Sequence, residues 1–254
     1  MTEISRHLRD LDLSLFDCIP SQTSNEDRRA LLGVQRAVMR RQRQFAYLEI
    51  GSHLGGSIQP YLVNPTCTHI YSIDPRPLLQ SDDRAEAYIA DYPENSTSRM
   101  LGNLRAIDPE AVCKVQCFEA DARDVDVAAI EIRPMIAFID GEHTREAVNS
   151  DFDFCLRVVA TGGVIVFHDF PIIYKAIFDA LHKLRGSNCL AYLIEGTVFS
   201  IFLDPALVHE DEYLYARYKE HCHHHRWHAM KQALSPFMPK LIKSIYRRAR
   251  GNSA

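Results

Sequence analysis

The sequence predicts an α/β protein built on an open parallel β-sheet. Three apolar, strand-prone runs carry this prediction, and each stops abruptly at glycine or polar residues: Phe45–Ile50, Met135–Ile139 and Val164–Phe167. Continuous apolar runs are typical of central strands in a parallel sheet, because helices cover both faces of such a sheet. Segments with helical periodicity follow these runs, so strands and helices alternate along the chain.

Composition places the chain among globular proteins. Of its 254 residues, 46% are hydrophobic and 24% are charged, and the net charge of −4 offers no electrostatic basis for nucleic acid as a partner. The seven cysteines are scattered and odd in number, which argues against a disulfide framework. The first ten residues are charged, and no apolar run is long enough to span a bilayer. We therefore expect a cytoplasmic protein without a transmembrane segment.

A helix is predicted before the first strand. Ser24 and Asp27 resemble a helix-starting cap, and apolar residues then recur at helical spacing over residues 25–43. The arginines of this segment are expected to form its solvated face: Arg36, Arg40, Arg41 and Arg43. We interpret residues 1–44 as an N-terminal helical segment, in which the helix over 25–43 covers the sheet or acts as a cofactor lid.

The first strand leads into a glycine-rich turn. Its notable positions are Glu49, Gly51, Ser52, Gly55 and Ser57. In an open α/β sheet such a turn lies at the carboxyl ends of the strands, where ligands bind. The dinucleotide pattern fails because His53 stands where glycine is required, and the phosphate-loop pattern fails because no lysine follows Gly56. A carboxylate at the strand end is better suited to a cationic ligand; the alternative is an ordinary tight turn.

The second and third predicted strands also end in acids. His69–Ile73 ends at Asp74, at the interval where such folds place a ribose-binding carboxylate, although Asp74 could also be a plain loop residue before proline. Lys114–Phe118 is followed by Asp121 and Ala122. Between these strands we expect helices over Asp82–Tyr92 and Ser96–Ile107.

The next two strands end in the most polar stretches of the chain. Met135–Ile139 runs into Asp140 and His143, and a helix over Thr144–Val159 follows. After two glycines, Val164–Phe167 runs into His168 and Asp169. Ionisable residues at the mouth of an apolar sheet are typical of a functional site.

Residues 45–169 resemble a group of class I S-adenosylmethionine-dependent methyltransferases that includes sugar and antibiotic O-methyltransferases. The resemblance rests on Glu49-x-Gly51-x-x-x-Gly55, on Ile139-Asp140-Gly141-Glu142-His143, on Asp151 in the following helix, and on Gly162–Asp169. It implies a Rossmann-like, seven-stranded, mostly parallel sheet with one reversed strand and helices on both faces. The last helix and strands would be Ile172–Leu184, Leu190–Leu193 and Val198–Leu203, which gives a methyltransferase domain over residues 45–204.

The resemblance also implies a cofactor, S-adenosylmethionine, and the residues that would bind it. These are Glu49, Gly51, Ser52, Gly55 and Ser57 in the glycine turn, Asp74 for the ribose, Asp121 and Ala122 for the adenine, and Asp140. The implied reaction is methyl transfer to a hydroxyl of a small molecule, a sugar or a glycosylated metabolite.

A sugar hydroxyl is a weak nucleophile, so we expect assistance from a base or a cation. His143, next to Asp140, is the candidate base. Asp140, His168 and Asp169 are candidate ligands for Mg²⁺ or Mn²⁺. Metal-dependent relatives often carry an acid at the position of His168, which favours a softer ion such as Mn²⁺ or Zn²⁺, or a metal-free polar network as the alternative.

Residues 205–254 are interpreted as a C-terminal helical extension. A helix over Asp211–Leu234 contains five histidines: His221, His223, His224, His225 and His228. All but His223 fall on one face and could hold a metal, but more simply form a solvated or partner-facing cluster. Lys240–Arg250 is a short basic amphipathic helix that could make weak contact with a membrane surface. Homo-oligomerisation is left open.

Two other functions remain alternatives at this point. One is a metal-dependent hydrolase or hydroxylase-like relative that uses Asp140, His168 and Asp169 without methyl transfer. The other is a non-catalytic binding module on the same fold, against which the intact acids and His143 argue.

Overall fold

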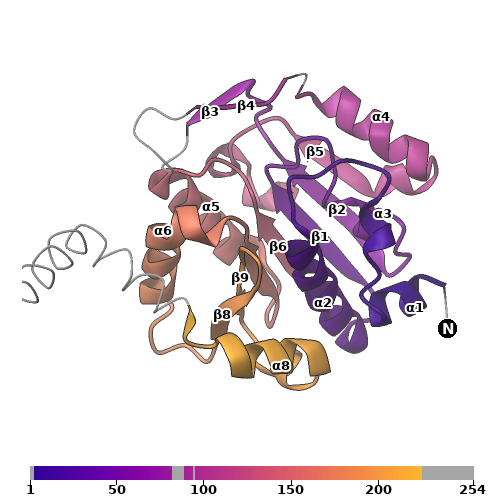
Figure 1. Cartoon of the computed structure of the whole chain (residues 1–254). Helices are drawn as coiled ribbons and strands as arrows, with labels where there is room; N and C mark the ends of the chain where they lie inside the picture. The colour runs from indigo at the N-terminus through magenta and orange to yellow at the C-terminus, as the bar shows by residue number, and fades with distance from the viewer. Residues whose placement is uncertain (1–2, 82–88, 94, 225–254) are drawn as a thin grey trace, which may run out of the picture.

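A seven-stranded β-sheet forms the centre of the protein (Figure 1). The computed structural model describes residues 3–81, 89–93 and 95–224. The strand order is β5-β2-β1-β6-β7-β9-β8, with bounds β1 Phe45–Ile50, β2 Cys67–Ile73, β5 Val115–Phe118, β6 Ile136–Ile139, β7 Val164–Phe167, β8 Leu190–Glu195 and β9 Val198–Phe202. Strand β9 runs antiparallel to both β7 and β8, and all other neighbouring pairs of this sheet are parallel. This confirms the predicted Rossmann-like sheet with one reversed strand.

Helices cover both faces of the sheet, and a separate apolar cluster fills each side (Figure 1). Side chains alternate along β1, so that Tyr47 belongs to one cluster and Leu48 to the other. The Tyr47 face is covered by α1 (Glu3–Arg9), α2 (Asn25–Arg41), α3 (Gln59–Leu62), α4 (Thr97–Ile107), α7 (Ala206–His209) and α8 (Glu212–His221). The Leu48 face is covered by α5 (Arg145–Val158) and α6 (Phe170–Lys183). Short 3₁₀ turns complete the chain at Leu13–Phe16, Ala111–Lys114, Ala122–Asp124 and Val127–Ala129.

The register of the parallel strands brings the predicted site residues to one edge. Ile50 of β1 pairs with the last residue of β2 on one side and with Ile139 of β6 on the other, and Ile139 pairs with Phe167 of β7. The residues that follow these strands are Asp74, Gly51, Asp140 and His168. They therefore lie side by side at the carboxyl edge.

Helix starts are specified by local sequence. At α2, Ser24 accepts a hydrogen bond from the Asp27 N–H while the Asp27 carboxylate accepts from the Ser24 N–H, which is a complete capping box. Thr144 caps α5 through its hydroxyl. The predicted helices at 25–43, Thr144–Val159 and Ile172–Leu184 agree with α2, α5 and α6 to within two residues.

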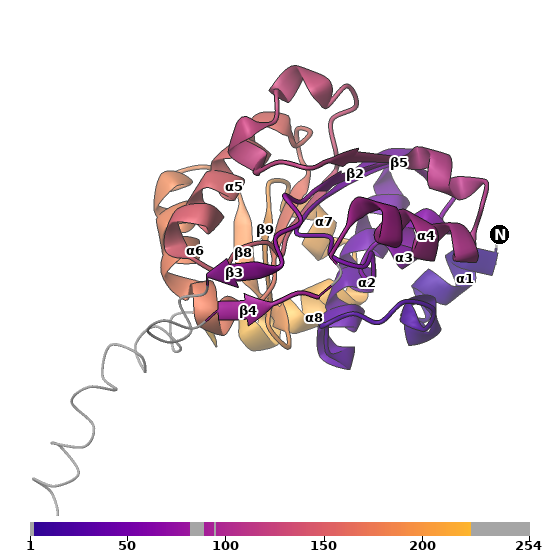
Figure 2. The same cartoon turned by 90° about the horizontal axis from the view of Figure 1, so that it is seen from above.

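The prediction of a helix over Asp82–Tyr92 is wrong for its last residues. Ile89–Asp91 forms strand β4, which pairs antiparallel with β3 (Leu79–Ser81), while residues 82–88 lie outside the described part. In Figures 1 and 2 this hairpin lies above one end of the sheet. Backbone pairing across the hairpin, extended by the Tyr92 N–H bond to the Leu78 carbonyl (2.8 Å), outweighs the weak helical periodicity.

The arginines of α2 do not all face solvent, which corrects a second expectation. Arg36 donates two hydrogen bonds to Asp211, at 2.9 and 2.6 Å, and its side chain is only 12% exposed. Sequence periodicity could not reveal this partner, because Asp211 lies 175 residues further along the chain.

The described part of the chain ends within the histidine-bearing segment. His221 lies at the end of α8, and its Nδ1 is 2.7 Å from the Ile194 carbonyl of β8. His225, His228 and the basic segment Lys240–Arg250 lie outside the described residues. All seven cysteines are free thiols. Among the described residues, no helix combines the length and apolar character needed to cross a membrane.

Candidate functional site

The glycine turn packs directly against the end of β6. Gly51 has φ +87°, and a Cβ placed there would lie 2.2 Å from the Asp140 carbonyl oxygen. Any other residue would have a strained backbone at this position, and its Cβ would clash with Asp140, so only glycine fits. The glycine turn and Asp140 therefore form one continuous wall.

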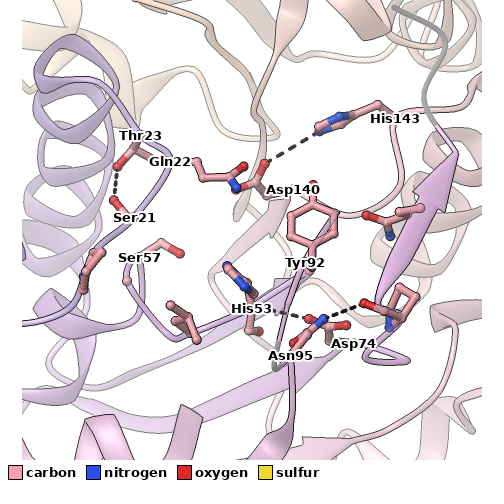
Figure 3. A pocket seen from close by; sticks show the side chains of 17 residues that line it. Ser21, Gln22, Thr23, His53, Ser57, Asp74, Tyr92, Asn95, Asp140 and His143 are labelled. Carbon is pink, nitrogen blue, oxygen red and sulfur yellow. Dashed lines mark hydrogen bonds and ion pairs between the residues drawn. The ribbon is translucent and has the colours of Figure 1, made fainter. Parts of the chain in front are cut away.

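Two pockets open along this wall, and Gly51, Asp74 and Gln80 line both. The first pocket is shown in Figure 3 and includes the predicted residues Ser52, Ser57, Asp140 and His143. The second is lined by the predicted pair Asp121 and Ala122, together with Gly141, Glu142 and Asp151. An elongated ligand could therefore extend from one pocket to the other past Asp74.

Asp74 is held rigidly between the pockets. Its Oδ2 accepts a hydrogen bond from the His53 N–H (3.0 Å), and its Oδ1 accepts one from the Arg76 N–H (2.7 Å). The Arg76 guanidinium lies 3.2 Å from Oδ2. His53 adopts a left-handed conformation (φ 43°), which is unusual for a residue other than glycine. The carboxylate orientation is thus fixed before any ligand arrives.

Glu49 lies behind the turn and does not line either pocket. It is completely buried, and it accepts hydrogen bonds from the Tyr47 and Ser57 hydroxyls. Burial raises the pKa of Glu49 to about 8, against the opposing effect of these two hydrogen bonds. Gly55 also lies away from the pocket walls, where it packs against Met100 and Leu104 of α4.

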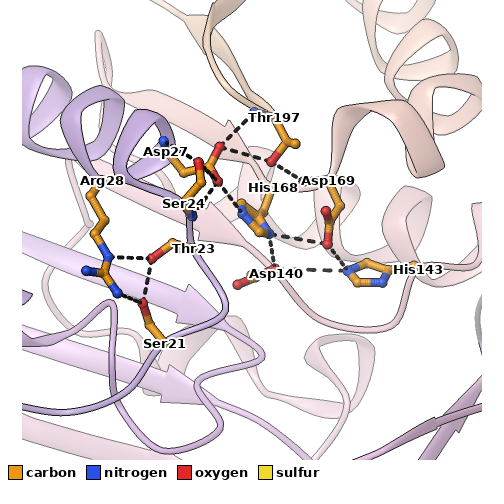
Figure 4. Close-up of polar contacts among 10 residues, drawn as sticks. All are labelled: Ser21, Thr23, Ser24, Asp27, Arg28, Asp140, His143, His168, Asp169 and Thr197. Carbon is orange, nitrogen blue, oxygen red and sulfur yellow. Dashed lines mark hydrogen bonds and ion pairs between the residues drawn. The ribbon is translucent and has the colours of Figure 1, made fainter.

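An acid–histidine network connects β6, β7 and α2 (Figure 4). His168 Nδ1 lies 3.0 Å from Asp140 and 3.3 Å from Asp169, and its Nε2 lies 3.4 Å from Asp27. Burial alone would lower the pKa of His168, but the three carboxylates raise it well above its ordinary value. Burial likewise opposes ionisation of Asp140, yet His168 and His143 lower its pKa to about 2.

Asp140, His143 and Asp169 form a group that could hold a metal ion, since one ligand atom from each lies within 4.8 Å of the others. His143 Nε2 is 3.3 Å from Asp169 Oδ2 and 4.0 Å from Asp140 Oδ1. Two carboxylate oxygens and an imidazole nitrogen suit Mn²⁺ or Zn²⁺, and the carboxylates alone suit Mg²⁺. The predicted group contained His168 instead, but both ring nitrogens of His168 face carboxylates.

The N-terminal segment closes one side of the first pocket, with Ser21, Gln22 and Thr23 in its wall. Arg28 donates to the Thr23 hydroxyl (3.2 Å) and the Ser21 hydroxyl (3.3 Å). Sequence analysis suggested a lid for the helix over 25–43 and did not identify these residues, which precede that helix. The capping box at Asp27 was visible in the sequence, whereas its contact with His168 was not.

The β3–β4 hairpin supplies another part of this pocket wall. Gln80, Tyr92 and Asn95 line the pocket, and the Tyr92 ring packs edge-on against His53 with centroids 5.2 Å apart (Figure 3). No motif marked these residues, because their position depends on how the hairpin folds over the sheet edge.

Residues 48–170 match a protein family described as a methyltransferase domain. The match begins in β1 and ends at the start of α6, so it includes every predicted site residue. Fold and match together make this part of the chain similar to a methyltransferase domain.

Several solved methyltransferases share this fold at low sequence identity. The calicheamicin methyltransferase CalS11 is 14% identical, with 79% of this chain and 91% of that chain covered at a TM-score of 0.52. The O-methyltransferase NovP is 15% identical, with 68% and 77% covered at 0.51. TomG from Streptomyces achromogenes, an O-methyltransferase involved in tomaymycin synthesis, is 14% identical, with 80% and 91% covered at 0.50.

A curated viral protein is also similar in sequence. Uncharacterized protein R132 of Acanthamoeba polyphaga mimivirus is 23% identical over 155 residues, which is 59% of this chain. The match spans 65% of the viral protein's length.

Proposed function

We propose that this chain transfers a methyl group from S-adenosylmethionine to a hydroxyl of a small molecule, a sugar or a glycosylated metabolite. The observation that carries the proposal is the pair of pockets that share Gly51 and Asp74 in their walls, with Asp140 and His143 in the wall of the first. This layout provides a site for an elongated donor and places ionisable groups beside one end of it.

The donor would lie along the glycine turn. Asp74 would accept hydrogen bonds from the ribose hydroxyls, and Asp121 and Ala122 would contact the adenine in the second pocket. Gly51 and Ser52 would approach the amino acid part, near Asp140. Glu49 and Gly55 would act indirectly by holding the turn in shape, while Ser57 both lines the first pocket and donates to Glu49.

The reaction is an in-line displacement at the methyl carbon. The bond from the acceptor oxygen to carbon forms as the sulfur–carbon bond breaks, and S-adenosylhomocysteine leaves. The acceptor hydroxyl loses its proton to His143 Nε2, which faces Asp140 and Asp169. Fixed walls orient the acceptor towards the methyl group, and orientation alone can contribute several kcal/mol, up to about 7–11 in the best cases.

A divalent cation fits beside these groups. Asp140 and Asp169 would hold it, with His143 either adjacent or as a third ligand, and His168 would keep both carboxylates in place through Nδ1. Such a cation would lower the pKa of the acceptor hydroxyl.

The wall of the first pocket supports a hydroxyl-rich acceptor. The amide side chains of Gln22, Gln80 and Asn95 both donate and accept hydrogen bonds, and Tyr92 offers an aromatic ring beside them. This combination is complementary to a sugar ring, which has hydroxyls at its edges and C–H groups on its faces.

Calorimetry with S-adenosylmethionine and S-adenosylhomocysteine tests the proposal. Both should bind, and Asp74→Asn should weaken binding by about 1.5–3 kcal/mol through loss of charge-assisted hydrogen bonds. Asp153→Asn is the matched control, because Asp153 is exposed and pairs with Lys183 away from both pockets. Binding of NAD in preference to both compounds would reject the proposal. With binding established, mass spectrometry of a sugar panel should reveal a product heavier by one CH₂ group, as expected for one methylation.

A further inference from the structure

The second pocket contains a buried carboxyl group that the proposed reaction has not used. Asp151 lies on α5, is 7% exposed, and lines the pocket together with Asp121 and Ala122. Within the described ranges, no hydrogen bond or ion pair engages its oxygens. The carboxyl group approaches the backbone at Gly141, where a Cβ would lie 3.5 Å from Oδ2.

An unpaired carboxylate is unfavourable in such a place, because it loses its hydration without gaining a partner. Burial raises the pKa of Asp151 to about 7, the negative charges of Asp121 and Glu142 add to this effect, and Arg123 opposes it. Cys155, one turn further along α5, is also buried, and its pKa is raised well above the ordinary value. Around neutral pH, Asp151 is therefore present in substantial part as a neutral carboxylic acid.

A carboxylic acid presents a donor and an acceptor side by side. Adenine offers the complementary pair, because its 6-amino group donates next to a ring nitrogen that accepts. We propose that Asp151, as a neutral acid, binds the adenine ring of the methyl donor by accepting from the 6-amino group and donating to the adjacent ring nitrogen. This inference rests on the proposed function and assigns it a specificity-determining residue.

Two substitutions separate this role from simple packing. Asp151→Asn keeps a donor and an acceptor at the same place, since an amide also pairs with the adenine edge. Asp151→Val keeps the approximate shape and removes both. Thermal unfolding of each variant checks that it is folded, and the Asn variant remains informative if the Val variant is unstable.

The first measurement compares S-adenosylhomocysteine with its analogue that lacks the 6-amino group. The wild type should prefer the natural compound, and Asp151→Val should reduce this preference on the order of tenfold, as expected for loss of a buried hydrogen bond. Asp151→Asn should keep the preference. An unchanged preference in folded Asp151→Val would overturn the inference.

The second measurement is the pH dependence of S-adenosylhomocysteine binding. If the neutral acid binds adenine, wild-type affinity should fall above about pH 7, by up to tenfold per pH unit. The affinity of Asp151→Asn should not show this fall. Other titrating groups are the same in both proteins, so the difference between the two pH profiles reports Asp151 alone. Identical pH profiles would overturn the inference while leaving the proposed function intact. Failure of the wild type to bind at any pH would overturn both.

Discussion

At the scale of single residues, His143 could serve as a base or as a metal ligand. Its Nε2 faces two carboxylates, at 3.3 Å from Asp169 and 4.0 Å from Asp140, and the imidazole is buried at the pocket wall. A histidine that holds a cation cannot accept a proton at the same nitrogen. The two roles therefore predict different consequences of its removal.

If His143 is the general base, His143→Ala should lower kcat by about 10²–10⁴-fold and leave S-adenosylhomocysteine affinity nearly unchanged. A metal-ligand role would instead show as weaker cation binding, with activity recovered at high cation concentration. Helix capping is already provided by Thr144, so loss of stability is not the expected effect. A folded variant with wild-type kcat and pH–rate profile would show that the base lies elsewhere.

Glu49 should make the stability of the protein depend on pH. The pKa of Glu49 is about 8 in the folded protein, against an unperturbed value of 4.5. The contribution of this group to the free energy of unfolding is therefore full below about pH 4.5 and is lost as the pH rises through 8. In Glu49→Gln, which stays neutral, unfolding in urea should show less loss of stability between pH 5 and 9. The control is Glu131→Gln, at an exposed position. Parallel pH profiles for wild type and Glu49→Gln would contradict this account.

At the scale of secondary structure, α2 connects distant parts of the molecule. Its N-terminus binds Thr197 through Asp27, whose carboxylate accepts from the Thr197 N–H at 2.7 Å, and it also faces His168. Its middle pairs through Arg36 with Asp211, which in turn caps α8. The helix thus links the site to the last helix of the described chain.

Removing Arg36 should therefore destabilise the fold. Asp211 is only 1% exposed, and Arg36→Met would leave it with the more distant Arg40 (3.3 Å) and Tyr213 and Leu214 N–H groups. Breaking a buried ion pair costs about 3–5 kcal/mol, and the remaining partners should bring the loss to the lower end of that range. Arg41→Met, which removes a more exposed pair with Asp204, should cost about 1 kcal/mol or less. Equal losses in urea unfolding would contradict the importance of the Arg36–Asp211 contact.

At the scale of the whole molecule, the site exists only where separate parts of the chain meet. The first pocket combines the N-terminal segment, the glycine turn, the β3–β4 hairpin and the end of β6. The candidate metal ligands come from the loops after β6 and β7. The division into residues 1–44, 45–204 and 205–254 stays a prediction, although α2 and α8 share a core cluster with the sheet.

Cation removal tests this assembled site. Chelation should sharply reduce turnover, and Mg²⁺ or Mn²⁺ should restore it. Mn²⁺ binding measured by calorimetry should weaken in Asp169→Asn and remain unchanged in Asp153→Asn, which lies away from the site. Full turnover after exhaustive chelation, with no metal by elemental analysis, would leave a metal-free polar network as the better account.

The sequence by itself predicted the alternation of the sheet strands with helices and the acids and histidines at the carboxyl edge, and its resemblance to methyltransferases implied one reversed strand. Apolar runs, helical periodicity and glycine positions are local signals, and parallel strands necessarily end at one edge. The common edge of Asp74, Gly51, Asp140 and His168 could therefore be inferred before any coordinates, whereas their order along it follows from the strand order of the sheet.

Only the tertiary structure decided the partners of buried charges and the walls of the pockets. Asp27 meets His168, and Arg36 meets Asp211, across more than a hundred residues of chain. Strand β4 stands where the end of a predicted helix was expected, and Asp151 proved to be a buried pocket residue. Local periodicity shows which face of an element is apolar, but burial and pairing depend on what packs against it, because the energies of desolvation and charge interaction are set by three-dimensional neighbours.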